Sequence, residues 1–160
     1  MLAVTIIQLL VFITYISYLI YKFGVLPSIS ESYYALMDSR KSYLFFLFTS
    51  ALGVTMILQA QDQHVWYLIS GIGLLFVGAA SLFKVKEDGT AAIHYIGACV
   101  GIVGALIGHI EVYNLLWPVG VYLAGTLIIL SVFRNGSYIW WMEILAFITI
   151  IAGFISQLSL

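Results

Sequence analysis

Long apolar runs separated by short polar gaps make up almost the whole chain. The runs predict helices over about 2–23, 42–60, 66–83, 92–110, 114–133 and 138–158. Each run is close to the ~20 residues that an α-helix needs to cross the hydrocarbon core of a bilayer. Polar and apolar positions do not alternate along the runs, as they would in a transmembrane β-barrel. The pattern therefore predicts an all-α, polytopic membrane helix bundle, with six transmembrane helices in a single domain over 1–160.

The longest gap, between the first two runs, carries its own helix signal. Pro27 is followed by Ser28, and Glu31 stands three residues after that serine. A serine followed three residues later by a glutamate is typical of a capping box at a helix start. We therefore expect a short interfacial helix from about Ile29 to Met37 in this first loop.

Charge is rare and unevenly placed. Hydrophobic residues make up 63% of the chain and charged residues 8%, whereas an ordinary soluble domain has roughly a quarter charged residues. All six basic residues fall in alternate gaps, namely the first, third and fifth: Lys22, Arg40, Lys41, Lys84, Lys86 and Arg134. Basic loops stay on the cytoplasmic side of a membrane. We therefore expect an integral inner-membrane protein with loops 1, 3 and 5 cytoplasmic and both termini outside.

Small residues line one side of two neighbouring runs. Gly97, Gly101 and Gly104 follow helical spacing, and the preceding run offers Gly71 and Gly78. Small residues on facing sides let membrane helices approach closely. We expect the runs 66–83 and 92–110 to pack tightly through these five glycines.

The chain has a single cysteine, Cys99, which lies within the run 92–110. We interpret it as a small core residue.

Glu143 is the one acid well inside an apolar run, roughly 8 Å from the end of its helix. An acid at that depth is expected to face the bundle interior and to have a partner. On the expected topology it shares the cytoplasmic end with a group of polar residues. The candidate binding residues are therefore His94, Glu143, Ser28, Ser30, Tyr34 and Lys22. No cofactor is expected. No metal is expected either, since His94 and His109 lie ~22 Å apart along one helix.

Two short motifs carry a resemblance. They are Pro27-Ser28-Ile29-Ser30-Glu31-Ser32-Tyr33-Tyr34 and, further on, Ile93-His94-Tyr95-Ile96-Gly97-Ala98. Over about 20–110 the chain resembles small bacterial multi-pass membrane proteins that have a Pro-Ser-Ile-Ser…Tyr-Tyr loop and a His-x-x-x-Ala helix start. The resemblance implies that the loop and His94 belong together.

A more distant similarity is to the alkaline-ceramidase-like membrane hydrolases. These use a serine, an aspartate and three histidines around a metal. His94 and a loop serine match two of those five groups, and residues 138–160 contain no histidine. The constellation that hydrolysis would need is therefore incomplete.

Four functions remain open from these observations. The first is a cytoplasm-facing polar pocket that binds a lipid head group or another small amphiphile. The others are a small transporter or channel subunit, a degenerate ceramidase-like hydrolase, and an accessory protein that packs against a partner membrane subunit or a second copy of itself. The expected partners are membrane lipids and not nucleic acid, because six basic residues on one membrane face are explained by anionic lipid.

Overall fold

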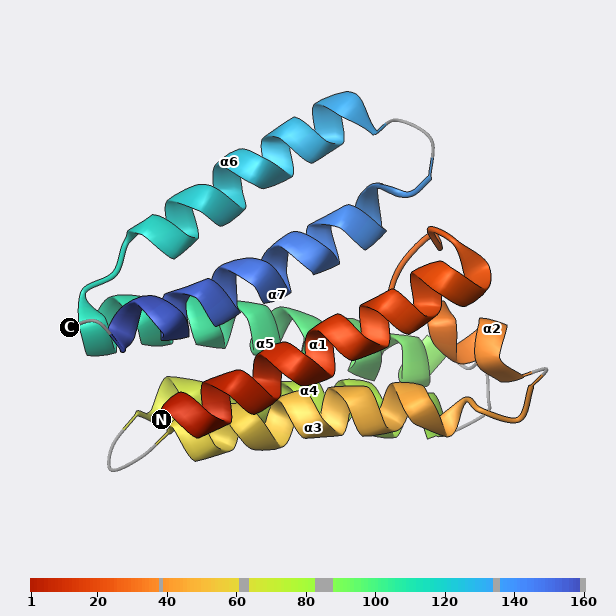
Figure 1. Ribbon diagram of the computed structural model, residues 1–160, viewed down its shortest axis with the longest axis horizontal. Coiled ribbons are helices and arrows are strands. Elements are labelled where there is room, and N and C mark those ends of the chain that lie inside the picture. The colour runs from red at the N-terminus through yellow and green to blue at the C-terminus, as the bar shows by residue number, and fades with distance from the viewer. Residues whose placement is uncertain (38, 61–63, 83–87, 134–135, 159–160) are drawn as a thin grey trace.

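The computed structural model describes residues 1–37, 39–60, 64–82, 88–133 and 136–158, with the backbone alone for 81–82 and 88–91. These residues form seven α-helices and no strand (Figure 1). The helices are α1 (Leu2–Phe23), α2 (Ser32–Met37), α3 (Tyr43–Gln59), α4 (Val65–Leu82), α5 (Asp88–Tyr113), α6 (Trp117–Val132) and α7 (Tyr138–Gln157). The predicted all-α class is confirmed.

The six long helices follow the six apolar runs, with small shifts at their ends. Helix α6 begins at Trp117 rather than at 114, because Asn114 has a positive φ of 54° that stops α5. Pro118 then stands in the first turn of α6, where its missing N–H costs little. The short first-loop helix exists, and it begins three residues later than predicted, at Ser32.

Length and composition support a membrane protein. Among the described residues three helical segments are long and apolar enough to cross a bilayer: Leu2–Phe23, Ala92–Tyr113 and Tyr138–Gln157. Three shorter apolar segments accompany them, namely Tyr43–Gln59, Val65–Ala80 and Trp117–Val132.

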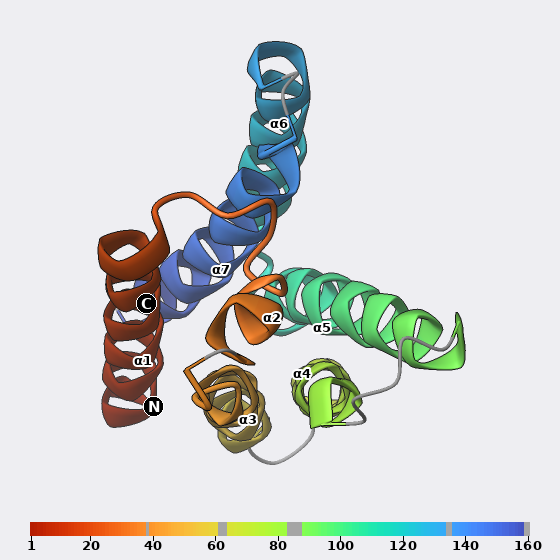
Figure 2. The ribbon, with the colours of Figure 1, turned by 90° about the vertical axis from the view of Figure 1, so that its right-hand side faces the viewer.

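Helix α4 lies between α3 and α5, and the three form one row (Figure 2). The expected glycine contact with α5 is present, but α4 contributes a different residue. A Cβ atom placed on Gly73 would lie 2.7 Å from the carbonyl oxygen of Gly97. By contrast, a Cβ atom on Gly71 would lie 2.5 Å from the carbonyl oxygen of Gly53, which is in α3. The prediction that Gly71 and Gly78 face α5 was therefore wrong, since Gly71 meets α3 at Gly53 and Gly78 meets it at Thr49.

Helix α7 connects the rest of the bundle to this row. It contacts α1, α5 and α6, whereas α6 lies outermost and packs mainly on α7 (Figure 2). The side chains of Phe12, Phe48 and Phe147 bring α1, α3 and α7 together, with ring centroids 5.6–5.8 Å apart. Most side chains of α6 are exposed, and Leu127 is 70% exposed. Lipid or another protein is expected to cover them in a membrane.

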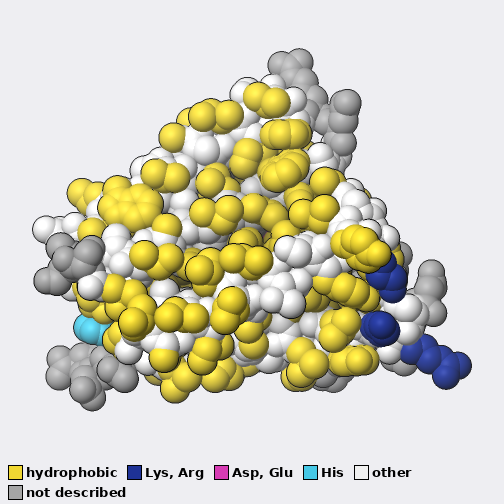
Figure 3. All heavy atoms as spheres, in the orientation of Figure 1, with side chains coloured by type: hydrophobic (Ala, Val, Ile, Leu, Met, Phe, Trp, Pro, Cys, Tyr) yellow, Lys and Arg dark blue, Asp and Glu magenta, His cyan; other side chains and the backbone are white. Residues whose placement is uncertain are grey.

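The two ends of the bundle differ in charge. The described basic residues Lys22, Arg40 and Lys41 lie together at one end, here called the basic end (Figure 3). The N-terminus and the end of α7 lie at the opposite end (Figure 1). Lys84, Lys86 and Arg134, on which the charge argument also relied, lie outside the described residues.

Cys99 was expected in the core and is exposed instead. It lies on a side of α5 that turns away from the glycine contact, as does its exposed neighbour Tyr95. A single apolar run does not distinguish a face that meets another helix from one that meets lipid, which is why this prediction was wrong.

The contact at Gly73 gives a direct test of the packing. We expect Gly73→Ala to lower the stability by about 1–3 kcal/mol, because the added methyl group meets the backbone of Gly97 and Gly101, which cannot move aside. Gly120→Ala is the matched control, since nothing lies within 4 Å of a Cβ atom at that position. Thermal unfolding in detergent measures both. Equal melting temperatures for the two variants would contradict the observed packing.

Candidate functional site

The loop after α1 is folded against the beginning of α7. Helix α1 ends at Phe23, and the next residue, Gly24, has a φ of 74° that turns the chain back toward the bundle. The carbonyl of Pro27 then accepts a hydrogen bond of 3.1 Å from the backbone N–H of Trp140. The Ser28 hydroxyl accepts one of 3.1 Å from the N–H of Glu31, as the capping signal predicted. These bonds fix the position of the segment between them.

Glu143 receives its partners from this loop. The backbone N–H of Ile29 donates to Oε2 at 2.5 Å, and the Ser30 hydroxyl lies 3.2 Å from Oε1. Both groups lie more than a hundred residues away in sequence. The expectation that Glu143 faces the bundle and is paired is confirmed. No lysine or arginine among the described residues forms an ion pair with it.

His94 closes the cluster from α5. Its Nε2 atom lies 2.8 Å from the hydroxyl oxygen of Ser30, so the predicted contact between His94 and the loop is confirmed. Ser30 thus lies between an imidazole and a carboxyl group. We call Glu143, Ser30 and His94 the polar cluster.

The polar cluster is not sealed inside the protein. All three side chains are half-buried, whereas the most tightly buried core side chains, such as Leu19 and Leu36, are fully covered. Tyr122 of α6 is close enough to Glu143 and to Cys99 to interact with both electrostatically. The pattern of the sequence did not single out Tyr122, because α6 shows no polar face of its own.

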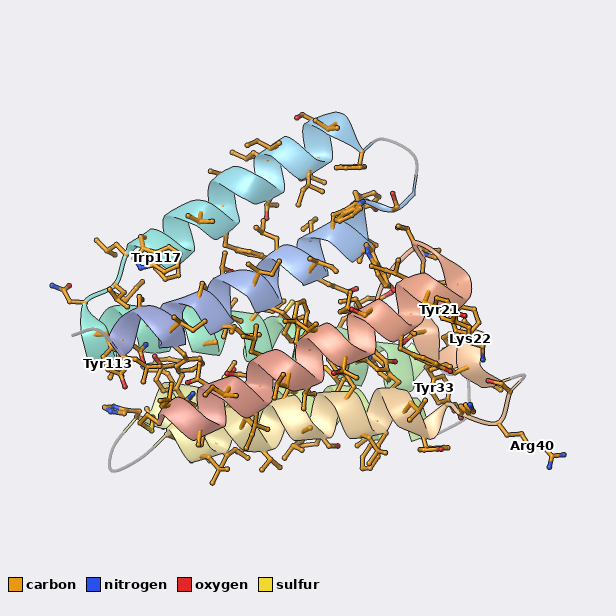
Figure 4. The ribbon with its side chains drawn as sticks, viewed as in Figure 1. Tyr21, Lys22, Tyr33, Arg40, Tyr113 and Trp117 are labelled. Atoms are coloured by element: carbon orange, nitrogen blue, oxygen red, sulfur yellow. The ribbon has the colours of Figure 1, made fainter. Side chains whose placement is uncertain are left out.

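Three of the predicted site residues do not join the cluster. Lys22 lies at the basic end, where its ammonium group donates to the Ser39 hydroxyl at 3.2 Å and lies over the Phe23 ring (Figure 4). Ser28 bonds within its own loop. Tyr34 is 47% exposed and packs against Tyr33. The structure brings together only His94, Ser30 and Glu143 of the six.

A second polar group, which sequence reasoning missed, lies near the opposite end of the bundle. His109 is completely buried, and its Nε2 atom lies 3.1 Å from the carbonyl oxygen of Ile150. Its Nδ1 atom lies 3.0 Å from the Tyr67 hydroxyl and 2.9 Å from the amide nitrogen of Gln157. A carbonyl only accepts, so Nε2 carries the proton and Nδ1 accepts. Every ring nitrogen is satisfied, and the group joins α4, α5 and α7.

An apolar groove runs along the outer side of α4 and α5. Its volume is about 350 Å³, and its lining includes Ile72, Phe76, Ile93, Ile96 and Val100. These side chains are suited to an acyl chain and offer no hydrogen bond.

The described residues contain no group of three or more His, Cys, Asp or Glu side chains close enough to hold a metal ion.

The chemistry available at the polar cluster is hydrogen bonding to a polar group. A carboxylate has about four acceptor positions, and Ile29 and Ser30 occupy two of them on Glu143. The remaining positions suit an ammonium or hydroxyl group. The side chains of Glu143, Ser30 and His94 are half-buried, so each keeps part of its surface exposed.

A double-mutant cycle tests whether the cluster acts as a unit. We expect Ser30→Ala and His94→Ala to be non-additive in the free energy of unfolding, by about 0.5–3 kcal/mol, because the two side chains share one hydrogen bond. The control pairs Ser30→Ala with His64→Ala at the other end, where the effects are expected to add. Thermal or denaturant unfolding in detergent gives the values, and strict additivity in the first pair would argue against a shared bond.

Comparison of the chain with protein-family models, with curated proteins and with solved structures gave no match. The similarity of the loop and helix-start motifs to small bacterial membrane proteins therefore remains a resemblance and assigns no family.

Proposed function

We propose that this protein is a six-span membrane protein that binds the polar head of an amphiphile at its cytoplasmic end. The observation that supports this proposal best is the polar cluster. An acid, a hydroxyl and an imidazole from three separate segments meet at one place and stay half-buried. Charged groups inside membrane spans are costly and usually mark a functional site.

The surroundings of the cluster favour an amphiphile over a soluble ligand. Basic residues at this end, Lys22, Arg40 and Lys41, attract anionic head groups. Close by, α5 and α6 expose apolar side chains such as Tyr95, Ile96 and Leu127. A molecule with a polar head and an acyl chain is complementary to both surfaces. The acceptor positions of Glu143 select a head group that carries an ammonium or hydroxyl group.

A hydrolase is the second candidate, because the 2.8 Å between Ser30 Oγ and His94 Nε2 is the distance of a nucleophile and its base. In a serine–histidine–acid triad the acid orients the second ring nitrogen of the histidine. Here the acid, Glu143, is hydrogen-bonded to the Ser30 hydroxyl instead of to the histidine ring. The geometry therefore favours binding over nucleophilic catalysis.

The six-span topology follows from the placement of charge. Helices α3, α4 and α6 are shorter than α1, α5 and α7, but they run alongside them and are as apolar. A helix somewhat shorter than the bilayer is accommodated by local thinning and by flanking polar residues. The aromatic residues Tyr113 and Trp117 lie at the end opposite Lys22 and Arg40 (Figure 4). We assign the basic end to the cytoplasm of the inner membrane.

Cysteine labelling tests the orientation. In a Cys99→Ser background, Lys41→Cys places a thiol at the exposed basic end and Leu116→Cys places one at the opposite end, where Leu116 is 65% exposed. An impermeant maleimide is expected to label Leu116→Cys in intact cells, and to label Lys41→Cys only after the membrane is opened. Labelling in the reverse order would place the basic end outside.

Ligand binding tests the polar cluster. We expect Glu143→Gln to weaken binding of a fluorescent phosphatidylethanolamine in nanodiscs about tenfold, or ~1.4 kcal/mol, since the amide loses the charge that attracts an ammonium group. Glu111→Gln is the matched control, because Glu111 is an exposed acid at the other end. A parallel titration with phosphatidylglycerol tests a hydroxyl-bearing head. Equal affinities of Glu143→Gln and the wild type for both lipids would refute the proposed function.

A further inference from the structure

The apolar groove between α4 and α5 has a floor of glycine. Gly73 and Gly97 both line it and are both buried, and a Cβ atom on Gly73 would lie 2.7 Å from the carbonyl oxygen of Gly97. Exposed apolar side chains form its walls, namely Ile72 and Phe76 from α4 and Ile93 and Ile96 from α5. Since the two glycines have no side chains, the close helix contact leaves a furrow between these walls.

The shape of the groove fits a single hydrocarbon chain. Its lining extends from Ile69 to Phe76 on α4 and from Ile93 to Val100 on α5, so it follows the helix axes for about 10 Å. A volume of about 350 Å³ over that length corresponds to a cross-section of roughly 35 Å². A helix with its side chains is ~10 Å across and needs roughly 80 Å². The groove is therefore too narrow for another helix and runs in the direction of lipid chains.

The groove lies in the half of the bundle that is nearer the basic end. Helix α4 ends and α5 begins at that end (Figure 1). Within the membrane-length segment Ala92–Tyr113, the groove takes up the first part, from Ile93 to Val100. A lipid whose chain occupies the groove therefore has its head group at the basic end. The basic residues of that end attract anionic head groups, and those described are Lys22, Arg40 and Lys41.

The groove and the polar cluster lie on different sides of the contact between α4 and α5. Gly97 of α5 meets α4. Counted from Gly97 at ~100° per residue, Ile93 and Ile96 fall on one side of this contact. His94 falls on the other side, where it meets Ser30. The groove is therefore a separate surface and not an extension of the polar cluster.

We propose that the apolar groove binds one acyl chain of an anionic phospholipid from the leaflet at the basic end. None of the eight residues that line the groove has a polar side chain. Lipid tails are as apolar as these side chains, so close packing and not the hydrophobic effect holds the chain. The glycine floor lets the chain approach the backbone while the walls contact it on both sides. An unfilled groove would lose these dispersion contacts.

Of the proposed function, this binding site requires only that α4 and α5 cross the membrane. It does not require a ligand at the polar cluster. The lipid in the groove is held by its chain and by the positive charge of the basic end, whereas the amphiphile at the polar cluster is held by the acceptor positions of Glu143. The two sites are therefore expected to fill independently.

Photocrosslinking of the full chain in nanodiscs tests the site, with phosphatidylglycerol that carries a diazirine in one acyl chain. Mass spectrometry of peptides locates the adducts. They are expected to be about tenfold more frequent on the groove walls than on α6, a difference that corresponds to a tenfold preference in binding. Helix α6 is the reference for unselective lipid contact, since Leu127 and Ile128 are 70% and 61% exposed. Phosphatidylcholine with the same chains is expected to give about fivefold fewer groove adducts, because its head group carries no net charge.

A substitution that fills the groove gives the second measurement. Val100→Phe adds a ring at the end of the groove that lies away from the basic end, and it is expected to reduce the groove adducts to the level of α6. Val121→Phe is the matched control, because Val121 is 45% exposed on α6, outside the groove. The affinity of Val100→Phe for phosphatidylethanolamine is expected to equal that of the wild type, so a failure of this site is distinguishable from a failure of the polar cluster.

Four results would overturn the acyl-chain site. Adducts spread evenly over α4, α5 and α6 of the wild type would show unselective lipid contact, and this result decides the question even if a variant fails to fold. Equal groove adducts from the two lipids would exclude an anionic head group. Groove adducts that persist in Val100→Phe would place the chain elsewhere. A groove without adducts, in a protein that native mass spectrometry shows to be a dimer, would make a second copy of the chain the occupant.

Discussion

The close approach of α4 to both of its neighbours is the contact on which the position of the polar cluster depends. Gly73 and Gly97 pack so tightly that a Cβ atom on either would collide with the backbone of the other. In a membrane, helix association relies on such close packing, because lipid tails are as apolar as the side chains. The same contact places Gly97 against Val77, about one turn along α5 from His94, and so holds this part of α5 in position beside α4.

Helix α7 supplies one residue of the polar cluster and two of the groups that bind His109. Toward the basic end it presents Glu143 to the first loop, and toward the other end Gln157 and the Ile150 carbonyl bind His109. Gly153 makes room for the His109 ring, since a Cβ atom there would lie 2.5 Å from Nε2. The two polar groups differ in one respect that matters for function. His109 and Tyr67 are fully buried and both ring nitrogens of His109 are paired, whereas the side chains of the polar cluster are half-buried.

That difference explains why the polar cluster and not the His109 group is the candidate site. A fully buried histidine whose two ring nitrogens are both paired stabilises helix packing and has no ring nitrogen to offer a ligand. The polar cluster brings together a carboxyl group, a hydroxyl and an imidazole that are half-buried, and it lies at the same end of the bundle as the basic residues.

The sequence by itself determined the helices, the segregation of charge and the end at which the site lies. The length of an apolar run, the gaps that hold basic residues and the presence of one acid, Glu143, inside a run are properties of single segments. They can therefore be recognised without a structure. Only the tertiary structure decided which glycines meet. Both sides of α4 carry small residues, and one helical pattern does not reveal that Gly71 faces α3 while Gly73 faces α5. It also decided the partners of Glu143, because one of them, the N–H of Ile29, is a backbone group. Every residue carries backbone groups, and only folding selects among them.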